Sequence, residues 1–151
     1  MAQAAESGGT ASEAGPERTP EEAQAAYAAG LDARDRGAHE EAANQFFTAY
    51  RSLPPEPRER RAAVLFELIA ARRSAYEAQG DAAQLCASQR VLDAYIEEQA
   101  AETDVHRDTR KARELRAVVT ADVELLRETD PALDCVTLRV EGGPPATAPE
   151  R

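Results

Sequence analysis

The chain has 151 residues, enough for one domain, and carries 28 acidic against 18 basic side chains for a net charge of −10. Only 5% of the residues are aromatic and none is Trp, whereas alanine, the best helix former, is abundant. This composition argues against a sandwich or barrel and predicts an all-α fold. The acidic balance disfavours nucleic acid as a partner, because a duplex ligand requires a clustered basic face. No run approaches the roughly 20 apolar residues of a spanning helix, so direct membrane insertion is not expected.

Residues 1–18 are small, polar and acidic without apolar periodicity, a pattern that predicts a disordered tail. The tail lacks the basic start and continuous apolar run of a signal peptide. A small-residue stretch directly after Met1 also fits the trimmed front of a secreted protein, and the sequence leaves both interpretations open.

Start and stop signals predict two short helices at the beginning of the ordered chain. Thr19 can cap the first helix, Pro20 suits its first position and Glu22 completes a capping box. Gly37 is placed to end this helix with a left-handed residue. The second helix carries a broad apolar stripe over 40–53, and the two prolines that follow must terminate it.

Three longer helices are expected over 58–79, 82–96 and 104–128. Gly80 closes the first of them and Asp81 can cap the second. The buried side of the last helix is expected to carry Leu115, Val118, Val119, Val123 and Leu126.

The helical domain therefore spans 19–130, and residues 131–151 read as a C-terminal tail or linker. Within this tail, residues 135–140 (CVTLRV) have the β-branched content of a short strand. A single strand without a predicted partner is marginal, so an irregular segment is the alternative.

The first hairpin resembles a tetratricopeptide repeat (TPR) over residues 23–54. Gly30 stands at the small mid-helix position of that motif, Gly37 at its inter-helix glycine and Pro54 at its terminal proline. The small–aromatic–small series of the second helix is matched by Ala42, Phe46 and Ala49.

The second helix pair matches this repeat in part. Tyr76, Gly80 and Leu92 fall on expected sites, while Arg73 occupies a small-residue position. The resemblance covers about residues 20–100, and it implies a short TPR-like stack of antiparallel helix hairpins, about five helices in all, with the last helix as a C-terminal cap. As a whole the chain is similar to bacterial envelope proteins that join such repeats to a terminal helix and linker.

The resemblance implies a concave groove, lined by the first helix of each pair, in which this repeat class binds an extended peptide or a partner's helix. The positions expected to face the groove are Tyr27, Leu31, Arg34, Asp35, Glu67, Ser74 and Glu77. This mixture of apolar and net-negative groups would suit a peptide with a basic residue beside an apolar anchor. The alternative is that these residues form ordinary surface.

Catalytic and metal-binding patterns are not found in the sequence. Neither His39 nor His106 has further ligands at a spacing that would assemble a zinc site. Paired carboxylates are adjacent in sequence and diverge on a helix. The sequence therefore predicts no enzyme activity, no metal and no cofactor.

Cys86 and Cys135 are the two cysteines of the chain. A disulfide between them would attach the segment after the last helix to the fourth helix and would contribute roughly 2–4 kcal/mol of stability. Two buried free thiols are the alternative. A disulfide would favour the periplasm or cell envelope over the cytoplasm, because disulfides persist in oxidising compartments.

Two functions follow from these observations. The first is a noncatalytic helical scaffold that binds a protein or peptide partner, in an assembly of the bacterial envelope. The second is a structural self-association domain, in which the same helices form a homo-oligomer.

Overall fold

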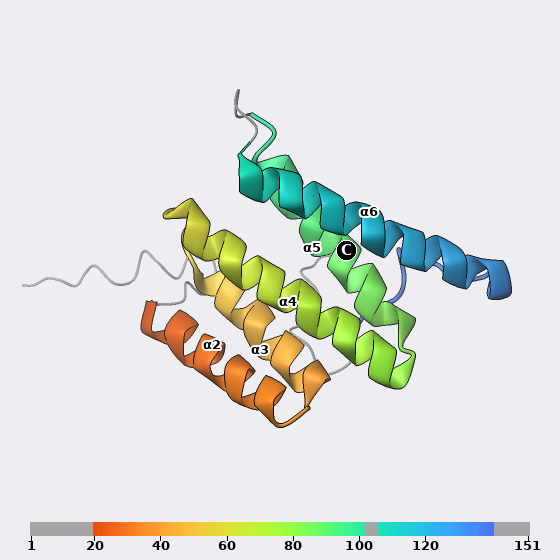
Figure 1. The fold of residues 1–151 in the computed structure, drawn as a ribbon, viewed down its shortest axis with the longest axis horizontal. Coiled ribbons are helices and arrows are strands. Elements are labelled where there is room, and N and C mark those ends of the chain that lie inside the picture. Colours follow the sequence, from red (N-terminus) through yellow and green to blue (C-terminus); the bar gives the residue numbers. More distant parts are fainter. Residues whose placement is uncertain (1–19, 102–105, 141–151) are drawn as a thin grey trace, which may run out of the picture.

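The computed structural model describes residues 20–101 and 106–140 and confirms the all-α fold. Five helices occupy this part of the chain (Figure 1): α2 (Pro20–Asp35), α3 (His39–Ser52), α4 (Arg58–Gln79), α5 (Ala82–Glu98) and α6 (Arg107–Thr129). The predicted disordered tail at 1–18, the capping residue Thr19 and the end of the predicted C-terminal linker, 141–151, lie outside the described residues.

The helices pack in chain order, each against the next, and α4 also contacts α6. Successive helices run antiparallel, so the chain zigzags from α2 at one side of the molecule to α6 at the other (Figure 1). This arrangement is typical of helices joined by short connections. It places α2, α4 and α6, the first helices of successive hairpins, in parallel orientation.

The turn between α2 and α3 is built around Gly37, which has a φ of 78°. The Ala38 N–H donates to the Ala33 carbonyl and the Gly37 N–H to the Arg34 carbonyl, both at 2.9 Å, which is the Schellman pattern of a helix C-terminus. Left-handed backbone of this kind favours glycine, so the predicted stop signal has its expected physical cause.

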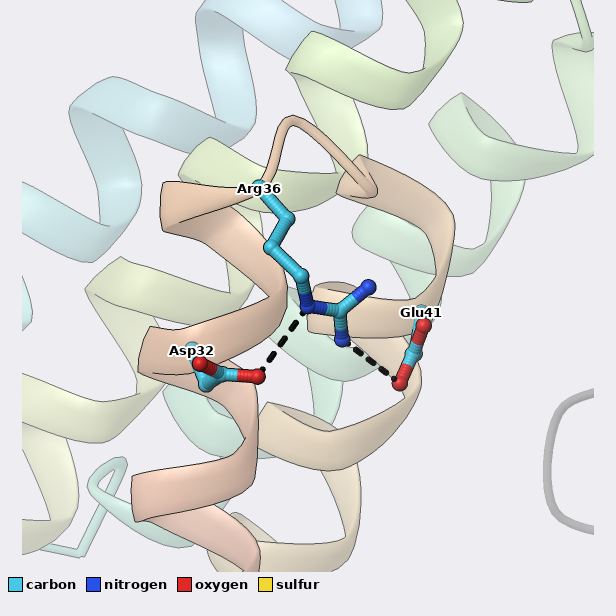
Figure 2. A network of polar contacts seen from close by, with 3 residues as sticks. All are labelled: Asp32, Arg36 and Glu41. Atoms are coloured by element: carbon cyan, nitrogen blue, oxygen red, sulfur yellow. Dashed lines mark hydrogen bonds and ion pairs between the residues drawn. The ribbon is translucent and has the colours of Figure 1, made fainter.

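The exposed guanidinium group of Arg36 bridges the two sides of the same turn (Figure 2). Arg36 Nε donates to Asp32 Oδ2 at 3.1 Å and Arg36 Nη2 donates to Glu41 Oε2 at 3.2 Å. These hydrogen bonds, first to Asp32 and then to Glu41, raise the pKa of Arg36. One side chain thereby joins the end of α2 to the first turn of α3.

The interface between α2 and α3 is a ring packed on a glycine. Phe46 is fully buried, and a Cβ added at Gly30 would lie 2.6 Å from its Cε1. The ring of Tyr27 lies against Phe46 with a centroid distance of 5.6 Å. Gly30 therefore allows the two helices to approach more closely than any larger residue would.

The core continues through α4, α5 and α6. The large fully buried apolar side chains beyond α3 are Leu65, Leu68, Ile69, Leu85, Leu92, Tyr95, Val119 and Val123. Gly80 ends α4 with a φ of 73°, and the Asp81 carboxylate accepts from the Ala83 N–H at 3.0 Å at the start of α5. Both signals act as the sequence predicted.

The final helix differs from expectation in two respects. It begins at Arg107, where the Nδ1 of His106 accepts from the Asp108 N–H at 3.0 Å, and not at residue 104. Val118 was expected on the buried side but is 41% exposed. Val119, the adjacent residue, is fully buried, and consecutive residues lie about 100° apart around a helix axis, so Val118 falls outside the narrow buried side of α6.

The segment after α6 returns to α5 and is attached there by a disulfide. Cys86 and Cys135 are bonded, with their Cα atoms 5.1 Å apart. No strand forms over 135–140 in the described chain, so of the two alternatives the irregular segment is the one observed. The backbone turns instead, because Asp134 accepts from the Val136 N–H through Oδ1 and from the Leu138 N–H through its carbonyl.

Candidate functional site

The exposed sides of α2 and α4 are joined by an ion pair across the stack. Arg34 Nη1 donates to Glu67 Oε1 at 2.8 Å. Both residues were expected to face the groove. Because Arg34 belongs to α2 and Glu67 to α4, the contact shows that these two helices present neighbouring sides to the same surface.

Two contacts extend this surface from α4 to α6. Arg73 Nη2 donates to Asp122 Oδ2 at 3.3 Å, and Lys111 Nζ lies 4.5 Å from the centre of the Phe66 ring. We call the surface spanned by these contacts the inner face. It comprises Tyr27, Leu31, Arg34, Phe66, Glu67, Ala70, Arg73, Ser74, Glu77, Lys111, Leu115, Val118, Asp122 and Leu125.

The predicted groove residues are distributed unevenly on the inner face. Tyr27 and Leu31 are half-buried and packed against the core, so each exposes only part of its side chain. Ser74 is half-buried and Glu77 is exposed on α4. Asp35 is 76% exposed at the edge of α2, with its Oδ1 3.9 Å from the Arg34 Nε.

The electrostatic character of the inner face differs from the predicted net-negative groove. Glu67 is neutralised by Arg34, and Asp122 by Arg73. Glu77 is left without an ion-pair partner among the described residues. The sequence could not show this pairing, because the two residues of each pair lie on different helices and are more than 30 positions apart in the chain.

The strongest apolar feature of the inner face lies on α6, the helix that was expected from the resemblance to serve only as a cap. Leu125 is 64% exposed and Val118 is 41% exposed, whereas most large apolar residues of this chain are covered. A cavity of 180 Å³ adjoins Leu125 between α4 and α6. Its lining residues are Arg73, Tyr76, Glu77, Asp122, Leu125 and Leu126.

A sequence signal for this feature did exist. Lys111, Leu115, Val118, Asp122 and Leu125 recur at intervals of four and three residues, which places them on one side of a helix. This stripe is distinct from the buried side of the helix, on which Leu115 and Val118 were expected. Between α2 and α6, the middle of α4 carries the exposed Ala70.

The inner face shows no assembly of reactive groups. No group of three or more His, Cys, Asp or Glu side chains that could hold a metal occurs in 20–101 and 106–140. His106 caps α6, and His39 begins α3 beside a 270 Å³ cavity lined largely by small residues and by Glu40 and Glu41.

Comparison with family models, with curated proteins and with solved structures finds no match for this chain. None of the helices in the described part of the chain combines the length and the apolarity that crossing a membrane requires.

Proposed function

We propose that this chain is a noncatalytic TPR-like scaffold that binds a protein or peptide partner across the inner face. The observation that carries the proposal is the exposure of Val118 and Leu125 beside the 180 Å³ cavity. Exposed apolar side chains rimmed by polar groups mark interaction surfaces in soluble domains.

The rim of this patch is polar and its charges are paired. Arg73 and Asp122 flank the cavity and satisfy each other, so a partner need not supply a counter-charge for either. Glu77 lines the same cavity and has no ion-pair partner within the described residues. These features favour a partner that carries an apolar anchor next to a single basic group, the kind of peptide that the sequence also suggested.

The Cys86–Cys135 disulfide supports an oxidising compartment for this activity. We therefore favour the periplasm or cell envelope of a bacterium over the cytoplasm as the location of this scaffold. Self-association through the same patch is the alternative function, because an apolar patch can equally pair with its own copy.

The experiment compares the chain with a test variant on the inner face and a control variant on another surface. The test variant carries Val118→Glu and Leu125→Glu on the inner face, and the control carries Val136→Glu, since Val136 is 77% exposed on the C-terminal segment. All three positions are exposed, so melting temperatures should change little.

Immobilised chain is used to capture proteins from an extract of its source cells, and each captured protein is purified and titrated against the variants. We expect the test variant to bind at least tenfold more weakly, which is about 1.4 kcal/mol, and the control to bind like the parent. Equal affinity of all three would move the interface off the inner face.

Sedimentation over a concentration series separates the two functions. A monomer at all concentrations supports the binding of a different partner. A dimer that is lost in the test variant and kept in the control supports self-association instead.

A further inference from the structure

Arg72 is an almost completely buried cation without a carboxylate. The residue is 3% exposed, its Nη1 donates to Gln84 Oε1 at 3.2 Å, and its Cζ lies 5.5 Å from the centre of the Phe47 ring. Its Nε and the Gln84 Nε2 are buried and have no hydrogen-bond partner. Buried arginines are normally paired with an acidic group, because an uncompensated charge is costly to remove from water.

Three more arginines lie on α3, on α5 and on the segment that the disulfide attaches to α5. Arg51 of α3 shares the Phe47 ring, with its Cζ 5.6 Å from the ring centre. Arg90 of α5 donates from Nη1 to the Cys135 carbonyl at 2.8 Å, in the segment that the disulfide attaches. Arg139 lies in the same segment, where its Nη1 donates to the carbonyls of Val136 and Leu138.

We call Arg51, Arg72, Arg90 and Arg139 the arginine cluster. The charges of three of its members affect one another. Burial lowers the pKa of Arg72 to about 10, and the charge of Arg90 contributes to that decrease. Burial and then the charge of Arg139 lower the pKa of Arg90.

No member of the cluster makes an ion pair with a carboxylate in the part of the chain that the structure describes. The chain as a whole carries ten more acidic than basic groups. The local excess of positive charge therefore stands against the overall charge of the chain.

The cluster lies on the opposite side of α4 from the inner face. Arg72 follows Ala70 by two residues, which turns its side chain about 200° around the helix axis. It points between α3 and α5, where it meets Phe47 and Gln84. A ligand at this position would leave the inner face free.

We propose that the arginine cluster is a binding site for an oxyanion, that is, a phosphate or carboxylate group. Arg72 forms the floor with its buried guanidinium, and Arg90 and the exposed Arg51 and Arg139 form the rim. Guanidinium groups donate in a planar fork that matches both oxyanions, and a bound anion would supply the missing counter-charge. This inference is independent of the proposed partner binding.

The test measures thermal stability and calorimetric binding of the full chain in sodium phosphate, sodium succinate and sodium chloride at equal ionic strength. Phosphate or succinate should raise the melting temperature in a saturable manner, because a ligand that binds only the folded state stabilises it. Stabilisation by phosphate alone identifies a phosphate-bearing ligand, and stabilisation by succinate identifies a carboxylate. If neither anion stabilises the chain more than chloride does, the proposal is wrong.

Two variants with the same change in charge locate the site. Arg90→Gln with Arg139→Gln removes two rim groups, and Arg60→Gln with Arg113→Gln removes two exposed arginines elsewhere on α4 and α6. We expect the dissociation constant to rise at least tenfold in the rim variant and less than twofold in the control. Equal constants in the two variants would contradict the proposal.

Arg72→Met tests whether Arg72 binds the anion, and the readout is the gain in stability on adding anion. Replacing an arginine with a purely structural role would not remove that gain. Without added anion this variant should be as stable as the parent or more stable, because an uncompensated buried charge is replaced by an apolar chain. With phosphate or succinate the parent should gain stability and the variant should not. Should Arg72→Met fail to fold, the rim variant still decides the outcome.

Discussion

Replacing Gly30 by alanine should destabilise the chain, although alanine is the better helix former. Gly30 lies in the middle of α2, and its missing side chain leaves room for Phe46 of α3. A Cβ at this position would be 2.6 Å from Cε1 and 2.7 Å from Cδ1 of that ring. Phe46 is fully buried and also touches Tyr27, so the ring has little freedom to move away.

Two opposing effects set the change in the free energy of unfolding. Alanine in place of glycine within a helix contributes about 1 kcal/mol of stability through its helix propensity. The added methyl group approaches the ring about 1 Å closer than the usual 3.5–4.0 Å between carbon atoms. Overpacking of a rigid core costs about 1–3 kcal/mol, and the short distances place this case at about 2–3 kcal/mol. The net loss should be about 1–2 kcal/mol, or roughly 4–8 °C in melting temperature.

Urea and thermal unfolding followed by circular dichroism measure this loss. Ala28→Gly is the control, because Ala28 is exposed on the same helix and reports the propensity difference alone. The packing cost at residue 30 is the sum of the two measured losses. If Gly30→Ala gains as much stability as Ala28→Gly loses, the close approach of ring and backbone does not exist.

A double variant tests the same contact from the other side. Phe46→Leu removes part of the ring that the new methyl group would meet. In combination with Gly30→Ala it should be less destabilising than the sum of the single changes, by about 1 kcal/mol or more. Strict additivity would mean that residues 30 and 46 do not share this space.

Two further predictions concern the disulfide and the buried tyrosines. Reduction of Cys86–Cys135, or Cys86→Ala with Cys135→Ala, should lower the free energy of unfolding by about 2–4 kcal/mol. Hydrogen exchange should increase more around α5 and α6 than in the α2–α3 hairpin, and equal increases throughout the chain would contradict this prediction. Burial raises the pKa of Tyr50 and of Tyr95, whose hydroxyls have no hydrogen-bond partner, so each phenol ionises more readily in the unfolded chain. The stability that depends on these neutral phenols is present below pH ~10 and is lost as the pH rises above that value, and melting temperatures measured as a function of pH check this. A phenolate absorbance titration should show late ionisation that is lost in Tyr50→Phe and Tyr95→Phe.

The boundaries of most helices follow from signals within a few residues of each end. Pro20, Gly37, Gly80 and Asp81 each act where the sequence predicted, because caps and stops depend on local backbone geometry and on hydrogen bonds to near neighbours. The all-α class likewise follows from composition and periodicity. The close packing of Phe46 on Gly30 is consistent with the TPR-like hairpin that the sequence suggested.

Contacts between distant parts of the chain were decided only by the tertiary structure. The sequence left the cysteines as a disulfide or as free thiols, and the fold brings their Cα atoms to 5.1 Å because the chain reverses after α6. Residues 135–140 have strand-forming composition, but in the described structure no neighbouring strand is there to share hydrogen bonds with them.

The candidate sites depend on such contacts even more strongly. The resemblance implied a groove and periodicity assigned net-negative residues to it, whereas the fold pairs Glu67 with Arg34 and leaves Val118 and Leu125 exposed on α6. Periodicity also cannot show that Arg72 is buried without a carboxylate, because that depends on which side chains α3 and α5 bring to it. Short-range patterns determine where helices form, and the charge and exposure of a surface depend on which helices become neighbours.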